Sequence, residues 1–124
     1  MTDVELAAAR IEPYARRTPL LRTEIDGKPL VLKLEHLQRT GSFKFRGAVN
    51  ALLAGGKPDR VVTASGGNHG MAVAEAASVL GIPATVYAPE SVPESKARRI
   101  LESGAELVRV GENLIVMSDR GKLS

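Results

Sequence analysis

The chain between residues 45 and 52 repeats apolar residues with a helical period. Its four apolar positions fall at i, i+3, i+4 and i+7: Phe45, Ala48, Val49 and Leu52. This spacing puts all four on one face, so it predicts an amphipathic helix packed on a core. Gly41 and Ser42 supply a turn and an N-cap before the helix, and the pair Gly55 and Gly56 suits its C-terminal end.

The N-terminal part of the chain predicts one helix and one strand. Thr2 and Glu5 have the spacing of a capping box, and the short amphipathic helix after them is interrupted by Pro13. Residues 18–21 are typical of a connecting segment, and residues 27–29 of a turn. Residues 30–35 begin apolar and then alternate, which predicts a strand that leads to the loop before the helix.

From Arg60 onward, short β-branched runs alternate with helical stretches. Three strands are predicted, at 61–63, 84–88 and 107–110. The two helices between them end at Gly81 and Gly104. This alternation predicts an α/β fold, an open parallel sheet with helical crossovers.

The rhythm of this pattern stops after Gly111. Three parallel strands alone leave sheet faces and edges uncovered, so we expect a truncated part of a larger fold. The chain then divides into an N-terminal segment of a larger domain that includes the lysine loop (1–50), an incomplete smaller βαβαβ domain (51–111) and a tail (112–124).

The composition excludes several classes of function. The 124 residues carry a net charge of +3 from 17 basic and 14 acidic side chains, scattered as singles and pairs, so no nucleic-acid partner is expected. The absence of cysteine excludes disulfides and thiol catalysis, and neither His36 nor His69 has a second ligand at metal spacing. No apolar run approaches the roughly 20 residues of a membrane span, and the acidic N-terminus is unlike a signal peptide, so we expect a cytoplasmic protein.

Lys44 stands where the predicted helix begins. Gly47, Ala48 and Ala51 lie beside its root, and these small residues leave room for a bulky group. The positive end of the helix dipole and partial burial both disfavour a charged amine, and a free amine can condense with an aldehyde. An ordinary surface lysine at a helix start is the alternative.

A glycine-rich loop, S-G-G-N-H-G at 65–70, follows the predicted strand at 61–63. In an open parallel sheet such loops form the ligand crevice, and glycine lets backbone amides approach an anion at the next helix N-terminus. The spacing matches neither the dinucleotide-binding motif nor the phosphate loop, so a nucleotide-binding module is disfavoured. A tight turn without a ligand remains the alternative.

Together the two stretches resemble the N-terminal part of the fold-type II (tryptophan synthase β-like) pyridoxal-phosphate enzymes, in the branch of threonine dehydratase and serine racemase. The resemblance rests on T-P-L at 18–20, L-K-L-E-H-L-Q-R-T-G-S-F-K-F-R-G-A at 32–48, S-G-G-N-H-G at 65–70 and G-I-P-A-T-V-Y-A-P at 81–89. It covers roughly residues 5–111. Phe45 favours this branch, since threonine and cysteine synthases resemble S-F-K-D-R or S-V-K-D-R at that place.

The resemblance implies a role for several residues. Lys44 matches the lysine that holds the cofactor, pyridoxal 5'-phosphate, covalently, and Phe43 the aromatic residue beside its ring. Asn68 matches the asparagine that hydrogen-bonds the ring hydroxyl. The loop that grips a substrate carboxylate, largely through main chain, corresponds to four residues: Ser65, Gly67, Asn68 and His69.

The implied activity is that of a lyase of amino-acid metabolism, which converts threonine or serine to a 2-oxo acid and ammonia by β-elimination. Racemases of this branch resemble it but have an acid/base serine at the place of Gly66. A glycine cannot move a proton, so elimination through Lys44 alone is favoured. We expect His69 to contribute its backbone rather than its imidazole, and Arg46 to fix local packing or an ion pair.

Enzymes of this family are more than twice as long as this sequence. The later glycine loop for the cofactor phosphate, the polar partner of the pyridine nitrogen and most of the larger domain's sheet have no counterpart here. The alternative is therefore a non-catalytic fragment, or an α/β module that binds an amino acid or a partner chain through the loop at 65–70. Expected partners are a hydroxy amino acid and either a second copy of the chain or the missing C-terminal portion.

Overall fold

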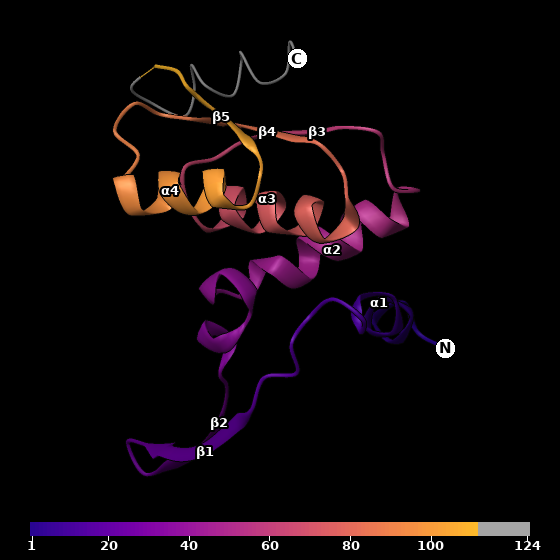
Figure 1. The fold of residues 1–124 in the computed structure, drawn as a ribbon. Helices are drawn as coiled ribbons and strands as arrows, with labels where there is room; N and C mark the ends of the chain where they lie inside the picture. The colour runs from indigo at the N-terminus through magenta and orange to yellow at the C-terminus, as the bar shows by residue number, and fades with distance from the viewer. Residues whose placement is uncertain (112–124) are drawn as a thin grey trace.

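The computed structural model describes residues 1–111, and its α/β architecture confirms the fold class expected from the sequence (Figure 1). Helices and strands follow in the order α1 (Asp3–Ile11), β1 (Leu20–Ile25), β2 (Lys28–Lys33), η1 (Glu35–Leu37), η2 (Arg39–Gly41), α2 (Lys44–Ala54), β3 (Val61–Ala64), α3 (Asn68–Leu80), β4 (Ala84–Ala88), α4 (Glu94–Glu102) and β5 (Glu106–Arg109). The predicted tail at 112–124 lies outside the described residues.

The three predicted strands form one parallel sheet in the order β3-β4-β5. Because each strand adds on the same side of the one before, α3 and α4 cross over on the same face of the sheet, below it in Figure 1. The core lies between this face and the two helices, where Val86 of β4 and Ile100 of α4 are fully buried. Its neighbour Leu101 is 53% exposed and lies outside this core.

Helix α2 packs against α3 on the side of α3 away from the sheet (Figure 1). Phe45 and Val49 are fully buried there against a row of small residues on α3, which includes Ala72 and Ala76. Alanine side chains let the two helix axes approach closely. This contact confirms the apolar face predicted for α2 and places the start of α2 beside β3 and the start of α3.

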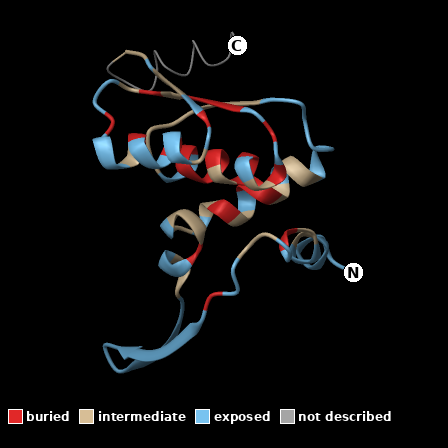
Figure 2. Ribbon diagram, viewed as in Figure 1, coloured by how far each residue is buried: buried red, intermediate tan, exposed pale blue. Residues whose placement is uncertain are grey.

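The antiparallel hairpin β1–β2 projects from the rest of the molecule, and every residue of both strands is exposed (Figure 2). Asp26 and Gly27 both have positive φ, at 52° and 75°, as a type I′ hairpin turn requires. The sequence predicted only the second strand, because Leu20–Ile25 lacks the alternation of a half-buried strand. In the structure, Leu20–Ile25 is a strand because it pairs with Lys28–Lys33. The turn between them is one residue earlier than expected.

The N-terminal helix α1 begins with the cap expected from the sequence. The backbone N–H of Glu5 donates to Thr2 Oγ1 at 3.2 Å, and Arg10 Nη1 donates to Asn50 Oδ1 at 2.6 Å. The second contact attaches α1 to α2, and Ile11 is buried in the same cluster as Phe45 and Val49 of α2. The division of the chain at residue 50 stays a prediction. No helix within residues 1–111 combines the length and the apolar character needed to cross a membrane.

Candidate active site

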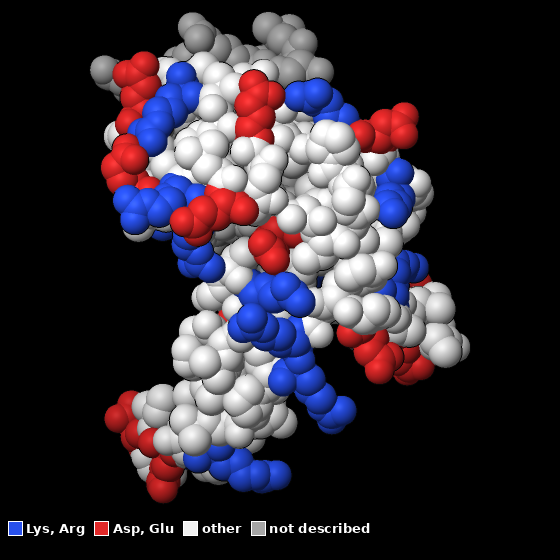
Figure 3. All heavy atoms as spheres, in the orientation of Figure 1, with Lys and Arg blue, Asp and Glu red and all other residues white. Residues whose placement is uncertain are grey.

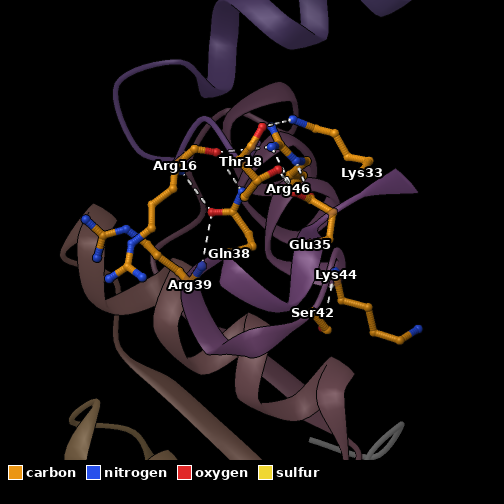
Figure 4. A network of polar contacts seen from close by, with 9 residues as sticks. All are labelled: Arg16, Thr18, Lys33, Glu35, Gln38, Arg39, Ser42, Lys44 and Arg46. Carbon is orange, nitrogen blue, oxygen red and sulfur yellow. Dashed lines mark hydrogen bonds and ion pairs between the residues drawn. The ribbon is translucent and has the colours of Figure 1, made fainter. Parts of the chain in front are cut away.

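Lys44 is the first residue of α2, as the sequence predicted. Its backbone N–H donates to Ser42 Oγ at 3.3 Å. The N-cap position is Phe43, whose side chain makes no cap hydrogen bond, so the N-cap expected at Ser42 was one residue too early. The Lys44 side chain is half-buried and extends away from the polar residues that precede the helix (Figure 4). The start of α2 therefore directs the amine to the opposite side, toward β3.

On that side, a cavity of about 390 Å³ lies between α2, β3 and the first turn of α3. Its lining is mostly small or aliphatic, with one amine, one imidazole and one hydroxyl: Phe43, Lys44, Gly47, Ala48, Ala51, Leu52, Val61, Val62, Thr63, His69 and Val73. The expectation that Gly47, Ala48 and Ala51 leave room beside Lys44 is confirmed. A volume of this size suits a small planar molecule.

Phe43 and Lys44 are close to one another at the mouth of this cavity. The Lys44 Nζ atom lies over the Phe43 ring, 5.3 Å from its centroid, while the Phe43 side chain is 64% exposed. Most of the Phe43 side chain is therefore free to contact a molecule in the cavity.

The glycine-rich loop joins β3 to α3, and a few hydrogen bonds define its shape. The Ser65 N–H donates to the carbonyl oxygen of Tyr87 at 2.9 Å, which continues the ladder between β3 and β4. Ser65 Oγ accepts from the Gly67 N–H at 3.2 Å. Gly67 caps α3, and Asn68 and His69, both exposed, occupy its first turn. The loop thus presents its amides at the positive end of a helix of 13 residues.

Two glycines of this loop lie in close contact with their surroundings. A Cβ atom on Gly70 would lie 2.2 Å from the carbonyl oxygen of Ser65, so only glycine fits there. A Cβ atom on Gly66 would lie 3.1 Å from both Pro89 Cδ and Val92 Cγ2. The loop is therefore packed between α3 and the segment that follows β4.

The structure brings some of the predicted site residues together and leaves others nearby. Phe43, Lys44 and His69 line the same cavity. Ser65, Gly67 and Asn68 belong to the same loop as His69 but are not among the lining residues. The sequence missed Thr63 and Val73 as lining residues. Their signal was weak, because a β-branched residue in a strand and an apolar residue in a helix are ordinary core positions.

A polar network lies behind Lys44 and was not foreseen, apart from the ion pair expected of Arg46 (Figure 4). Glu35 accepts hydrogen bonds from Arg46 and from the Thr18 hydroxyl. The bond from Arg46 is the main cause that holds the pKa of the Glu35 carboxyl below its ordinary value of 4.5. Thr18 and Lys33 lower this pKa further, while burial acts in the opposite direction.

Lys and Arg side chains gather at the narrow region between the sheet-bearing part and the hairpin (Figure 3). Arg16, Arg39 and Arg99 line a second cavity there, of about 500 Å³, together with His36. Glu75 compensates part of this charge through an ion pair with Arg39 at 3.3 Å. The Arg39 guanidinium also lies 5.9 Å from the centroid of the Phe45 ring. This surface is separate from the Lys44 cavity.

A scan against family models matches residues 11–122 to the pyridoxal-phosphate dependent enzymes. The chain belongs to this family. L-threonine dehydratase catabolic TdcB of Staphylococcus aureus is 42% identical over 119 residues, which cover 90% of this chain and 34% of that protein. The chain spans about a third of the length of the curated relatives it matches. Pyridoxal phosphate, expected from the sequence, is thereby confirmed as the cofactor of the family.

Solved structures agree with this assignment. The threonine deaminase of T.th. superposes with a TM-score of 0.87 at 42% identity, over 98% of this chain and 40% of that one. Maize serine racemase gives a TM-score of 0.88 at 37% identity, over 97% and 39% of the two chains. The fold-type II architecture and the branch expected from the sequence are confirmed.

Proposed function

We propose that this chain forms part of a pyridoxal-phosphate dependent lyase that converts threonine or serine to a 2-oxo acid and ammonia. The observation that carries the proposal is the position of Lys44, whose amine reaches a cavity lined by small and aliphatic residues at the start of α2. The relatives named threonine dehydratase and threonine deaminase support this choice of reaction.

The described residues fit a cofactor of this kind. The cavity beside Lys44 has about 390 Å³ of space, and the absence of bulky side chains at Gly47 and Ala51 leaves room for a planar ring. Lys44 would hold the cofactor covalently, Phe43 would pack beside the ring, and Asn68 would donate to the ring hydroxyl. When bound, this cofactor serves as an electron sink for the negative charge that develops at the substrate α-carbon.

Each protein group has one task in this proposal. The main-chain amides of the loop at 65–70, at the N-terminus of α3, would bind the substrate carboxylate. The uncharged Lys44 amine would take the α-proton. Departure of the β-hydroxyl with a proton releases water. The unsaturated amino acid that remains tautomerises and takes up water, which gives the 2-oxo acid and ammonia.

Gly66 favours elimination over racemisation. A racemase needs a second acid/base group on the face of the substrate opposite Lys44, and glycine carries none. The contacts of 3.1 Å from a Cβ atom at this position to Pro89 and Val92 leave little room for a side chain there. Since the similar structures include both a racemase and a deaminase, this local packing supports the choice between them.

A second candidate function is supported by the exposed hairpin. Leu20, Ile25 and Val31 on β1 and β2 are 64%, 53% and 52% exposed, and a two-stranded hairpin is marginally stable by itself. Under this alternative the chain is a non-catalytic fragment or binding module, and the reaction requires either the missing C-terminal portion or a partner chain. A homo-oligomer and a cytoplasmic location also stay predictions.

The test is to mix the 124-residue chain with pyridoxal phosphate, reduce with borohydride and map the labelled lysines by mass spectrometry. Selective labelling of Lys44, followed by 2-oxo acid release from threonine or serine, supports the lyase. Selective labelling without turnover supports the fragment. Equal labelling of Lys44 and the exposed lysines, such as Lys28 and Lys57, contradicts the assignment of Lys44.

A further inference from the structure

The orientation of Lys44 depends on a residue two positions further along α2. Residues two apart on an α-helix project about 200° from one another, since each residue turns the helix by about 100°. Arg46 faces the polar network behind the helix, and Lys44 extends away from it (Figure 4). Whatever fixes the rotation of Arg46 about the helix axis therefore also fixes the direction of Lys44.

Glu35 holds Arg46 by both carboxylate oxygens. Arg46 Nε donates to Glu35 Oε1, and Arg46 Nη2 donates to Oε2 at 3.1 Å. The Glu35 side chain is only 15% exposed, and that of Arg46 is 30% exposed. A two-point contact between two planar groups fixes their relative orientation as well as their distance. Because both groups are partly buried, the contact is screened less than one on the surface.

The same carboxylate binds the segment that precedes the hairpin. The hydroxyl of Thr18, which is 5% exposed, donates to Glu35 Oε2. The carbonyl oxygen of Thr18 accepts from Lys33 Nζ at 2.7 Å, and that of Arg16 accepts from Arg46 Nη2 at 3.1 Å. Three separate stretches of chain, 16–18, 33–35 and 44–46, thus meet at one carboxylate. The last of them carries Lys44.

Gln38 closes the network on the other side of the 3-10 turns η1 and η2. Its side-chain oxygen accepts from the Arg16 N–H at 2.9 Å, and its nitrogen donates to the Arg16 carbonyl oxygen at 2.8 Å. Gln38 is 2% exposed. This pair of bonds fixes residue 16 against the loop before Lys44. The segment around Thr18, which donates to Glu35, is therefore held in place independently of Glu35.

We propose that Glu35 is a positioning residue, whose carboxylate sets the rotation of the first turn of α2 and thereby directs the Lys44 amine into its cavity. This proposal rests on the proposed function of Lys44. Without the charge on Glu35, its side chain offers one acceptor oxygen instead of two, so the two-point contact with Arg46 is lost. The first turn of α2 can then rotate and fray. The amine then samples positions outside the cavity.

Glu35→Gln tests this, because it removes the charge and keeps the size of the side chain. Thr18→Val removes one donor to the carboxylate at constant volume, and Thr18→Ser restores it. Glu106→Gln is the matched control, since Glu106 is 62% exposed and pairs with Arg60 at 3.4 Å away from the cavity. All four variants are made in the 124-residue chain.

The first readout is the ratio of cofactor label on Lys44 to label on Lys57 and Lys96 after borohydride reduction. We expect this ratio to fall at least threefold in Glu35→Gln and in Thr18→Val, and to return toward the parent value in Thr18→Ser. Equal ratios in the parent chain, Glu35→Gln and Thr18→Val would overturn the proposal. A loss in Thr18→Ser as large as in Thr18→Val would overturn it too, because the hydroxyl is then irrelevant.

The second readout needs no cofactor and separates the two proposals. If the parent chain shows no preference for Lys44, the proposed function fails, and hydrogen exchange decides on Glu35. We expect the exchange rate of the amides at 44–48 to rise at least tenfold in Glu35→Gln. The exchange rates of the amides at 72–80 in α3 should stay unchanged in this variant. In the control Glu106→Gln, the rates of both segments should stay unchanged. Unchanged exchange at 44–48, or an equal rise in α3, overturns the positioning role.

Discussion

The Cβ position of Gly70 lies 2.2 Å from the carbonyl oxygen of Ser65. No side chain can occupy that point, because real Cβ atoms do not approach an oxygen so closely. The first turn of α3 therefore lies directly on the backbone of the loop that carries the candidate substrate-binding amides. This contact ties the shape of the loop to the packing of a buried helix.

Gly70→Ala should consequently destabilise the chain by about 3 kcal/mol or more, since backbone must move to admit one methyl group. Gly47→Ala is the matched control, because its Cβ atom meets nothing within 4 Å. In the interior of α2 it should be neutral or stabilise by up to about 1 kcal/mol. Urea unfolding followed by circular dichroism measures both, and equal midpoints would contradict the close approach.

The ion pair between Glu35 and Arg46 predicts a loss of stability in acid. The folded pKa of Glu35 lies below its ordinary value of 4.5. A lowered carboxyl pKa means that the stabilisation is complete above the unfolded value and is lost as the pH falls through the folded value. Arg46 stays charged throughout, so the carboxylate alone titrates in this pair.

The measurement is the free energy of unfolding from about pH 7 down to about pH 3, for the parent chain and for Glu35→Gln. We expect the variant to be less stable by about 1 to 3 kcal/mol near neutral pH, because Arg46 loses a charged partner in a partly buried place. The difference should shrink below about pH 4.5. A difference that stays constant over this range would contradict the role of the carboxylate charge.

The sequence predicted the sheet and its helices because their apolar positions follow regular periods. It also placed Lys44 and the glycine loop correctly in the chain, since both stand at predicted junctions between elements. It missed β1, because Leu20–Ile25 does not alternate apolar and polar positions as a half-buried strand does. It missed most of the Glu35 network because Thr18, Glu35 and Arg46 come together only in the folded chain. Their distances along the sequence follow no helical or strand spacing that would indicate a contact.

Gly66 gives a prediction about specificity and packing. Gly66→Ser should not create racemase activity, because the new side chain must first displace Pro89 or Val92. It should destabilise the chain by about 1 to 3 kcal/mol. Val92 is 5% exposed, and the double variant Gly66→Ser with Val92→Ala should lose less stability than the two single losses summed. Strict additivity would show that the contact with Val92 is not the cause.

The exposed hairpin predicts an uneven response to removal of apolar side chains. Leu20→Thr and Val31→Thr should each change the free energy of unfolding by less than about 0.5 kcal/mol, because both residues are already more than half exposed to water. Phe45→Ala, at a fully buried position, should cost about 3 to 5 kcal/mol. The three variants are compared by urea unfolding at two protein concentrations. A large, concentration-dependent loss in Leu20→Thr or Val31→Thr would mean that a second copy of the chain covers the hairpin in solution. An equally large loss at both concentrations would contradict the exposed position of the hairpin itself.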